Sequence, residues 1–453
     1  MTFQSFVEER KERSLTELIE LLRIPSVSTD SAHKSDVARC SELVAERLTE
    51  AGLATKIYPT KGHPVVYGER IDAPGKPTVL IYGHYDVQPP DPLDLWRHGP
   101  FEPTMEGEYL VARGATDDKG QFYALVKGVQ AAIETLGTLP VNVKMLIEGE
   151  EEIGSPSLGA FIDEHKERLA CDVIVISDCA QFGVDQPAIT YGLKGLCYME
   201  MTVTGPGHDL HSGAFGGAVA NPGNVLARLL AACQDEDGNI TIPGFYDDVR
   251  DLSDEERREL AALPFDEKVF LETTGARKVH GEPGFTTVER KGVRPTFDVN
   301  GLISGFTGEG AKTVLPSVAK AKFSMRLVPD QDPKKIGELA MNYLRSLVPE
   351  SVTVQIRDLH GANPVVVPRD GKFVAAAETA LERAFGSKPY YVREGGSIPI
   401  VNTFREKLGV DSLLLGLGLP NDRPHSPNEQ FRIKDFYRGQ VMMAAFLEEM
   451  AAT

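Results

Sequence analysis

Short apolar runs recur along the chain, and each stops at a glycine- or acid-rich turn. They cover residues 77–82 (PTVLIY), 141–147 (VNVKMLI), 172–176 (DVIVI) and 412–415 (SLLL). Apolar residues at helical spacing lie between the first two runs, at 120–136, and again at about 434–450. Continuously apolar strands that alternate with helices are typical of a mostly parallel sheet covered on both faces. The pattern predicts an α/β fold.

The N-terminal region has the spacing of an amphipathic helix. Apolar residues recur every three or four positions from Leu15 to Leu22, and Pro25 ends the pattern. Ser14 and Glu17 have the spacing of a capping box, in which each side chain bonds the other's backbone N–H. We therefore expect this helix to begin near Ser14.

The middle of the chain alternates with a period of two, as exposed strands do. Residues 318–327 place Lys320, Lys322, Ser324 and Arg326 on one face and apolar side chains on the other. Other extended runs and helical segments surround them, at 198–204, 221–233, 298–306, 332–347 and 351–357. The order β-α-β-β-α-β is that of a ferredoxin-like module, and Asp332-Pro333 is expected to cap its second helix.

The α/β pattern resumes after this module, so the module is predicted to be an insertion. A chain of 453 residues also exceeds what one core usually supports. We predict an α/β domain from residues 1–192 and 361–453, and an inserted α+β domain from 193–360. The charged, partly helical segment 244–293 is a further insertion within the second domain.

Composition and charge exclude several classes of partner. The net charge of -18 argues against nucleic acid or an anionic membrane as a partner. The charged N-terminus lacks the apolar core of a signal peptide, and no apolar run of about 18 residues is present. Five irregularly spaced cysteines fit a reducing compartment better than a disulfide framework. The expected location is the cytoplasm.

Residues that can bind metals follow the ends of the predicted strands. They are His84 and Asp86 after the first run, Glu150, Glu151 and Glu152 after the second, Asp178 after the third, His425 after the last, and Asp117 before a helix. The carboxyl ends of strands meet at one edge of an open α/β sheet, where ligands gather. Carboxylates and imidazoles bind zinc and similar divalent ions, and two neighbouring ions need a bridging carboxylate.

Each of these residues has an ordinary interpretation when it is taken alone. A single histidine is usually structural, three consecutive glutamates usually form a solvated surface, and Asp117-Asp118 fits turn chemistry. Packing gives no reason, however, to place so many acids and two histidines at one sheet edge. We therefore favour a metal site.

The chain also contains a series of motifs in the order in which a known family has them. They are YGHYDVQP, ARGATDDKGQ, EGEEEIGS, VISD, LHSG, FSMRLVP, REGGSIP and PHSPNE. The set resembles the carnosinase and cytosolic non-specific dipeptidase group of the di-zinc metallopeptidase family that includes aminoacylase and glutamate carboxypeptidase. The resemblance extends from about Ile24 to His425.

The resemblance implies a di-metal catalytic domain with a lid or dimerisation domain inserted in it. It places His84, Asp117 and Asp178 around one ion and Asp117, Glu152 and His425 around the other. Zinc is the expected metal, with manganese or cobalt as alternatives.

The remaining catalytic roles also follow from the resemblance. Asp86 is expected to hold the far nitrogen of His84, and the register of EGEEEIGS makes Glu151 the general base, a choice that spacing alone leaves open. The two metal ions would activate a water molecule that lies between them as hydroxide, with Glu151 as the proton acceptor. The resemblance further implies a cis peptide between Asp117 and Asp118.

Substrate contacts are implied for a second group of residues. Arg326 would clamp the terminal carboxylate of a peptide with its forked guanidinium. His211 would reach the substrate from the partner subunit, so a homodimer is expected. Further contacts are implied for Thr313, His360, Gly395, Gly396 and Ser397.

Three functions remain open at this point. The first is metal-dependent hydrolysis of dipeptides or short peptides, which the charged insertion and the strings FYDD and RPTFDVNG favour by resemblance. The second is an N-acyl amino acid deacylase of the same family, and the third is a binding module without catalysis. Neither the G-x-S-x-G elbow of a serine hydrolase nor an H-E-x-x-H zinc motif is present in the sequence.

Overall fold

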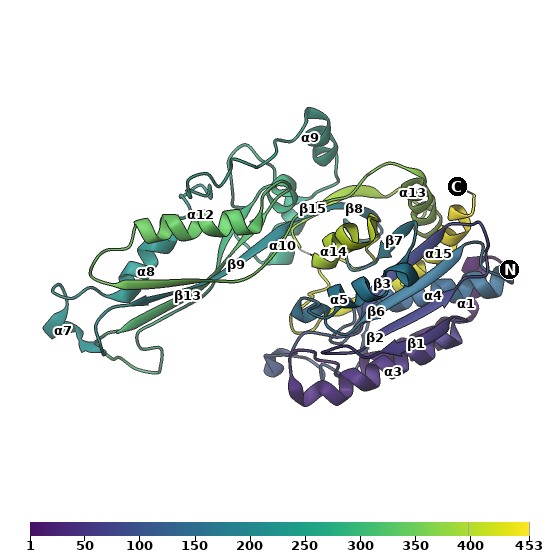
Figure 1. The fold of residues 1–453 in the computed structure, drawn as a ribbon, viewed down its shortest axis with the longest axis horizontal. Helices are drawn as coiled ribbons and strands as arrows, with labels where there is room; N and C mark the ends of the chain where they lie inside the picture. The colour runs from purple at the N-terminus through teal and green to yellow at the C-terminus, as the bar shows by residue number, and fades with distance from the viewer. Residues whose placement is uncertain (397, 453) are drawn as a thin grey trace. The chain divides into compact units, whose positions relative to one another are not determined.

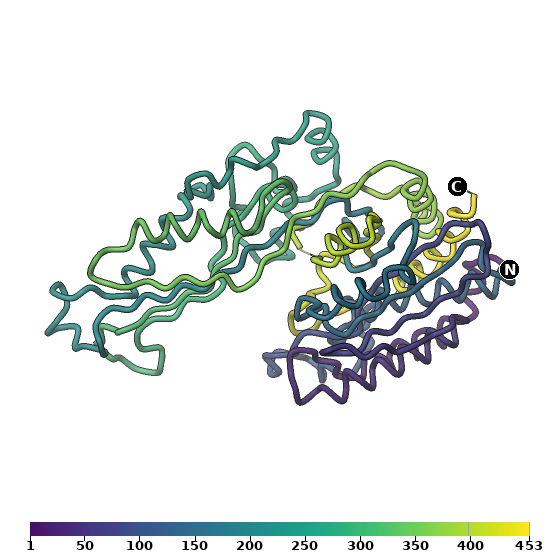
Figure 2. The backbone as a smooth tube through the Cα atoms, in the orientation of Figure 1, coloured from purple at the N-terminus to yellow at the C-terminus, as the bar shows by residue number. Residues whose placement is uncertain are grey.

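The computed structural model describes residues 1–396 and 398–452, which divide into two compact units. Unit 1 comprises Met1–Tyr191, Val367–Val392 and the chain from Ile400 onward, and unit 2 comprises Gly192–Val366 and Arg393–Pro399 (Figure 1). Gly192 and Leu193 pair antiparallel with Val366 and Val365, so the chain enters and leaves unit 2 through adjacent segments (Figure 2). The predicted division lay at residues 193 and 360, and the role of unit 2 as a lid stays a prediction.

Unit 1 is built on a sheet whose central strands are parallel. These strands are β6 (Asn142–Glu148), β3 (Thr78–His84), β7 (Val173–Ile176) and β17 (Ser412–Leu414), adjacent in this order. Antiparallel strands flank them: β1 (Ala54–Tyr58) and β2 (Val65–Arg70) beside β6, and β8 (Ala188–Leu193) beside β17, with β15 (Val365–Val366) and β16 (Tyr390–Glu394) paired to β8. The prediction of a mostly parallel α/β sheet is confirmed.

Helices cover both faces of this sheet. Every residue of a central strand such as β6 is therefore buried. One face packs in a core with helices α1 (Phe3–Glu9), α2 (Lys11–Leu22), α3 (Lys34–Glu50), α4 (Lys119–Leu136), α13 (Lys372–Phe385) and α15 (Ile433–Met450). The alternate side chains lie under α5 (Leu158–Glu164) and α14 (Pro399–Leu408), where the Tyr82 ring lies 5.4 Å from that of Phe404. The sheet is therefore the middle layer of three.

The predicted capping box at Ser14 is wrong. Helix α2 begins at Lys11, and Ser14 is buried in its interior. Glu17 instead turns into the core, where its carboxylate accepts hydrogen bonds from Tyr123 and Lys127. The local spacing suggested a helix cap, but the carboxylate of Glu17 forms an ion pair with Lys127 of another helix instead.

Unit 2 has the predicted β-α-β-β-α-β order, formed by β9 (Gly195–Thr204), α8 (Pro222–Ala231), β11 (Thr296–Ser304), β13 (Val318–Leu327), α12 (Pro333–Ser346) and β14 (Thr353–Ala362). Its antiparallel sheet has the order β11-β13-β9-β14. Asp332 caps α12 with Pro333 in its first turn, which confirms that prediction. Phe323 and Met325 are buried in the core that α8 and α12 complete, while Lys320 and Lys322 on the other face are exposed.

Smaller elements complete both units. In unit 1 they are β4 (Thr104–Glu106), β5 (Tyr109–Val111), β18 (Gln430–Arg432) and α6 (Lys166–Leu169), with 3-10 turns at Ser31–His33, Leu93–Leu95 and Glu151–Ile153. In unit 2 they are β10 (Leu210–His211), α7 (Ser212–Phe215), β12 (Val314–Leu315), and three helices of the charged insertion, α9 (Asp254–Ala261), α10 (Glu267–Thr274) and α11 (Thr287–Gly292).

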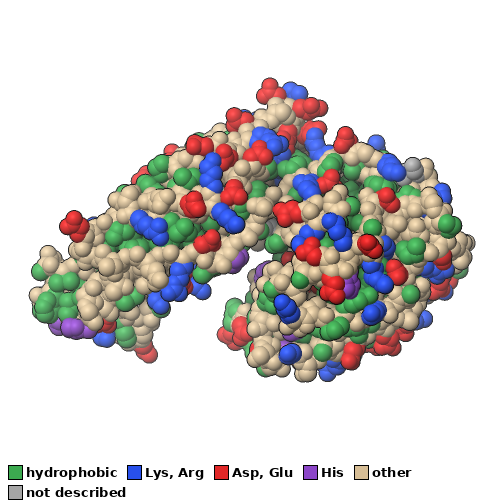
Figure 3. Space-filling model, viewed as in Figure 1, with side chains coloured by type: hydrophobic (Ala, Val, Ile, Leu, Met, Phe, Trp, Pro, Cys, Tyr) green, Lys and Arg blue, Asp and Glu red, His purple; other side chains and the backbone are tan. Residues whose placement is uncertain are grey.

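Two surface properties bear on partners. Among the helices of the described residues, none has the length and apolar character needed to cross a bilayer. Acidic and basic side chains are interspersed on the face that Figure 3 shows.

Candidate metal centre

The carboxyl ends of the parallel strands bring the predicted ligands to one edge of the unit 1 sheet. His84 is the last residue of β3, and Asp178 follows the end of β7 by two residues. Glu152 lies in the turn after β6, Asp117 lies just before α4, and His425 lies in the loop between β17 and β18. Parallel neighbours end at the same edge, so residues far apart in the sequence meet there.

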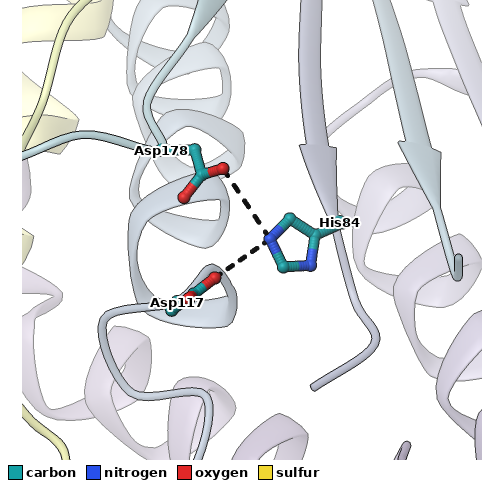
Figure 4. A group of neighbouring side chains, drawn as sticks. All are labelled: His84, Asp117 and Asp178. Atoms are coloured by element: carbon teal, nitrogen blue, oxygen red, sulfur yellow. Dashed lines mark ion pairs between the residues drawn. The ribbon is translucent and has the colours of Figure 1, made fainter. Parts of the chain in front are cut away.

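The first group of candidate ligands consists of His84, Asp117 and Asp178 (Figure 4). The Nε2 atom of His84 lies 3.1 Å from Oδ1 of Asp117 and 3.9 Å from Oδ2 of Asp178. The His84 side chain is fully buried. One ligand atom from each residue lies within 4.8 Å of the others, which is close enough for a common ion.

The second group consists of Asp117, Glu152 and His425. The Nε2 atom of His425 lies 2.9 Å from Oδ2 of Asp117 and 3.3 Å from Oε2 of Glu152. The His425 side chain is 56% exposed, whereas that of Glu152 is 3% exposed, so solvent reaches this group from the side of His425. Asp117 belongs to both groups, and its two oxygens point to different histidines. The peptide bond between Asp117 and Asp118 is cis, as the resemblance implied.

Asp86 connects His84 to the loop that carries the glutamates. The Nδ1 atom of His84 lies 3.1 Å from the backbone oxygen of Asp86 and 3.4 Å from its carboxylate. The carboxylate of Asp86 accepts the backbone N–H groups of Glu151 and Glu152, at 3.2 and 3.1 Å. Since a carbonyl oxygen only accepts, Nδ1 carries the proton of a neutral His84, which leaves Nε2 with a free electron pair.

The three consecutive glutamates, which spacing could not separate, have different surroundings. Glu150 is buried, and its carboxylate accepts the backbone N–H groups of His63 and Ser157, at 3.0 and 3.1 Å. Glu152 accepts a hydrogen bond of 2.7 Å from Nε2 of Gln88. Sequence reasoning counted Glu150 among the residues that can bind metals but gave it no specific role, and it did not single out Gln88, although Gln88 stands in the quoted motif YGHYDVQP.

The acids of the site differ in pKa: burial opposes ionisation of Asp117, but hydrogen bonds from His425 and His84 lower its pKa, whereas the pKa values of its neighbours are raised. Burial raises the pKa of Asp178 well above its usual range, and Asp117 adds to the effect. Burial also raises the pKa of Glu151 to about 7, which His84 opposes and Glu152 favours. Hydrogen bonds to Asp117 and Glu152 raise the pKa of His425 to about 10, so a proton is held where the negative charge is concentrated. The cluster therefore has a strong electrostatic preference for cations.

The donor atoms fit divalent metal ions. The buried Nε2 of His84 has no hydrogen-bond partner of suitable geometry among the described residues, and it faces carboxylate oxygens. A set of imidazole nitrogens and carboxylate oxygens suits zinc, manganese or cobalt. The arrangement is that of a candidate metal site at the edge of an α/β sheet.

The predicted substrate-contacting residues all belong to unit 2 or lie outside the described residues. Arg326 is half-buried on β13, and His360 on β14 has its ring 5.1 Å from that of Tyr198. His211 is exposed at the end of β10, where its Nδ1 accepts the N–H of Gly213.

Two further predicted contacts, Thr313 before β12 and Gly396, are exposed. Ser397 lies outside the described residues. Contact of these residues with substrate stays a prediction.

Comparison with known proteins identifies the family. The model of Peptidase family M20/M25/M40 matches residues 80–449. The chain is 32% identical to the Cys-Gly metallodipeptidase dug1 of Schizosaccharomyces pombe, over 98% of this chain and 97% of that one. It is also 32% identical to the human Beta-Ala-His dipeptidase, over 95% of this chain and 85% of the relative. The crystal structure of human carnosine dipeptidase 1 matches with a TM-score of 0.89 and 31% identity, and covers 100% of this chain and 98% of that one.

The chain therefore belongs to Peptidase family M20/M25/M40. The predictions of a metallopeptidase and of metal-dependent peptide hydrolysis are confirmed, and peptide hydrolysis is favoured over deacylation.

Proposed function

We propose that this chain is a dipeptidase that hydrolyses the amide bond of dipeptides or short peptides with two divalent metal ions. The observation that carries the proposal is the position of Asp117, whose two oxygens face His84 and His425 separately. A pair of neighbouring ions requires a shared carboxylate of this kind. Relatives that are named as dipeptidases and align over nearly the whole chain support the substrate class.

The proposed ligands are His84, Asp117 and Asp178 for one ion, and Asp117, Glu152 and His425 for the other. Zinc is the proposed metal, with manganese and cobalt as alternatives, because the same nitrogen and oxygen donors accept all three. When bound, such ions polarise a substrate carbonyl and lower the pKa of water.

The chain's own residues then orient the ligands and move the proton. Asp86 holds the Nδ1 proton of His84 in place through its backbone oxygen and fixes the loop of the glutamates through its carboxylate. Glu150 is committed to backbone amides and Glu152 is a proposed ligand, so Glu151 is the candidate general base. Glu151 would accept a proton from the attacking water and return it to the departing amine.

Residues of unit 2 are proposed to recognise the substrate. The guanidinium of Arg326 suits a bidentate bond to the terminal carboxylate of a peptide. His360, Thr313, Gly396 and Ser397 would contact the remainder of the peptide, as the resemblance implies.

A homodimer is proposed because His211 would act in the active site of the partner subunit. The exposed position of His211 supports this role, as do the exposed apolar side chains of Leu302 and Ile303 on the edge strand β11. The five free cysteines support a cytoplasmic location.

Mixed dimers test whether His211 acts on the partner. A dimer of one His211→Ala subunit and one Glu151→Gln subunit contains one site in which both residues are intact, provided His211 acts across the interface. Such a dimer should recover about half of the wild-type activity, since one of two symmetric sites is complete. Activity no higher than that of either parent variant would place His211 in its own subunit's site and remove this argument for the dimer.

A substrate panel tests the proposed activity against its alternative. The metal-loaded protein would be assayed on Xaa-Gly and Xaa-His dipeptides and on acetyl and succinyl amino acids, with zinc, manganese and cobalt in turn. We expect faster turnover of the dipeptides. Faster turnover of the acyl compounds would favour an N-acyl amino acid deacylase, and inertness towards every compound would favour a binding module.

A further inference from the structure

Glu429, the last residue of the string PHSPNE, is fully buried beside the loop that carries Asp117. Its Oε2 accepts hydrogen bonds from Nη1 of Arg113 at 2.6 Å and from the N–H of Gly114 at 3.0 Å. Its Oε1 accepts the N–H groups of Thr116 at 2.9 Å and Asp117 at 3.1 Å. One carboxylate therefore fixes the backbone on both sides of the turn that leads to Asp117.

The same residue is tied to the loop of His425. Glu429 follows His425 by four residues, and its backbone oxygen accepts the N–H of Ala112 at 3.0 Å. The next residue, Gln430, pairs with Val111 in the sheet formed by β5 and β18. Strand β5 thus leads into the loop of Asp117, strand β18 follows the loop of His425, and Glu429 lies where the two loops meet these paired strands.

We infer that Glu429 is a positioning residue that keeps Asp117 aimed at both histidines. The amide of Asp117 is one of its four donors, so a shift of Glu429 would turn the backbone from which the shared carboxylate extends. It also couples this carboxylate to the loop of His425, whose Nε2 lies 2.9 Å from Oδ2 of Asp117. The inference rests on the proposed pair of metal ions.

A carboxylate suits this position better than an amide of the same shape. Both oxygens of Glu429 accept two N–H groups each. In Glu429→Gln one of the oxygens becomes an N–H₂ group, which would face two other donors. Buried donors without acceptors are costly, so the turn would move to relieve them.

Metal binding by Glu429→Gln tests the inference. The metal-free protein would be titrated with Mn²⁺ alone, followed by electron paramagnetic resonance, in which neighbouring Mn²⁺ ions give a coupled spectrum. We expect Glu429→Gln to bind manganese roughly 10- to 100-fold more weakly and to lose the coupled signal, as substitution of residues that support metal ligands does. The matched control is Glu108→Gln, which removes the charge that pairs with Arg432 in the same small sheet and should leave the signal unchanged.

Two more variants separate positioning from simple stabilisation. Arg113→Lys replaces the one side-chain donor by a different one and leaves the three backbone bonds of Glu429, so it should retain the coupled signal even where it lowers the melting temperature. Glu429→Asp keeps the charge and should bind metal better than Glu429→Gln, which also covers the case in which the glutamine variant does not fold. Wild-type affinity and coupling in Glu429→Gln, or equal losses in Arg113→Lys, would overturn the inference. Failure of the wild-type protein to bind two ions would instead overturn the proposed function.

Discussion

The carboxylates that support the candidate metal centre of unit 1 and the predicted substrate-contacting histidines of unit 2 differ in burial. In unit 1, Asp86, Glu150 and Glu429 are almost fully buried, and each of these carboxylates accepts backbone N–H groups from a neighbouring loop. In unit 2, His360 and His211 are exposed, on an open sheet face and in a short surface strand respectively. The carboxylates of unit 1 are held by hydrogen bonds to the backbone, whereas the histidines of unit 2 lie on the surface.

This difference fits the different tasks that are proposed for the two sets. Buried carboxylates that bond to backbone amides hold loops at a fixed distance before any ligand binds, which suits a metal site that needs accurate geometry. Exposed side chains on strands reorient at little cost, which suits contacts that form only with a substrate or a partner. Substitutions of the candidate site residues of unit 1 should therefore change metal content or chemistry, and substitutions of the predicted substrate contacts of unit 2 should change KM.

The largest effect is expected for Asp117→Asn, because Asp117 belongs to both candidate ligand groups. The variant should lose both ions and activity, whereas Asp178→Asn, which alters one group, should retain about one ion per subunit. Metal analysis after gel filtration measures both. Equal metal content in the two variants would contradict a shared aspartate.

The next largest effect is expected for Glu151→Gln. An amide cannot take up the proton, so kcat should fall roughly 10²- to 10⁴-fold while metal content is unchanged. The matched control is Glu164→Gln, at the exposed end of helix α5, which follows the loop of Glu151 along the chain. Near-normal turnover in Glu151→Gln would assign the base elsewhere.

A smaller, different effect is expected in unit 2. Arg326→Met should raise KM for dipeptides roughly 10- to 100-fold, because a charged hydrogen bond contributes about 1.5–3 kcal/mol, and it should leave metal content unchanged. Lys322→Met, four residues earlier on the same strand and exposed, controls for loss of positive charge. A drop in bound metal with unchanged KM would break the contrast between the units.

The smallest effect on activity is expected for Glu17, a buried carboxylate of unit 1 that belongs to neither candidate ligand group. Burial opposes ionisation of Glu17, but bonds from Lys127, Tyr123 and Arg13 lower its pKa from 4.5 to about 2. The lowered pKa means that Glu17 stabilises the fold at pH above 4.5, and that this stabilisation is lost as pH falls towards 2.

Glu17→Gln should therefore lower the unfolding free energy at neutral pH by about 3 kcal/mol with unchanged kcat. Denaturant titrations at several pH values would measure how the difference from wild type shrinks below pH 4.5. The exposed Glu12→Gln on the same helix is the control. A difference that does not depend on pH would exclude ionisation as the cause.

Much of the fold and of the candidate site could be predicted from the sequence. The continuous apolar runs predicted the parallel strands, because burial on both faces of a sheet leaves a local signature. The ends of those runs carry His84, Asp178 and the glutamates, so a common sheet edge followed from topology alone. The resemblance added roles to these residues, and it implied which of the three glutamates is the general base and which is a metal ligand.

What the sequence left open depends on contacts between segments that are distant along the chain. The amide of Asp117 and the carboxylate of Glu429 are 312 residues apart, and Gln88 meets Glu152 across 64 residues. Likewise, Glu17 bonds to Lys127 where local spacing had suggested a helix cap.

The sequence by itself thus determined the strands, the inserted module and the kinds of ligand at the sheet edge, because hydrophobic period and residue chemistry are local properties. Only the tertiary structure decided which carboxylates face the site and which bond to backbone amides behind it. Side-chain direction and hydrogen-bond partners are set by how separate loops pack, and no local pattern records that packing.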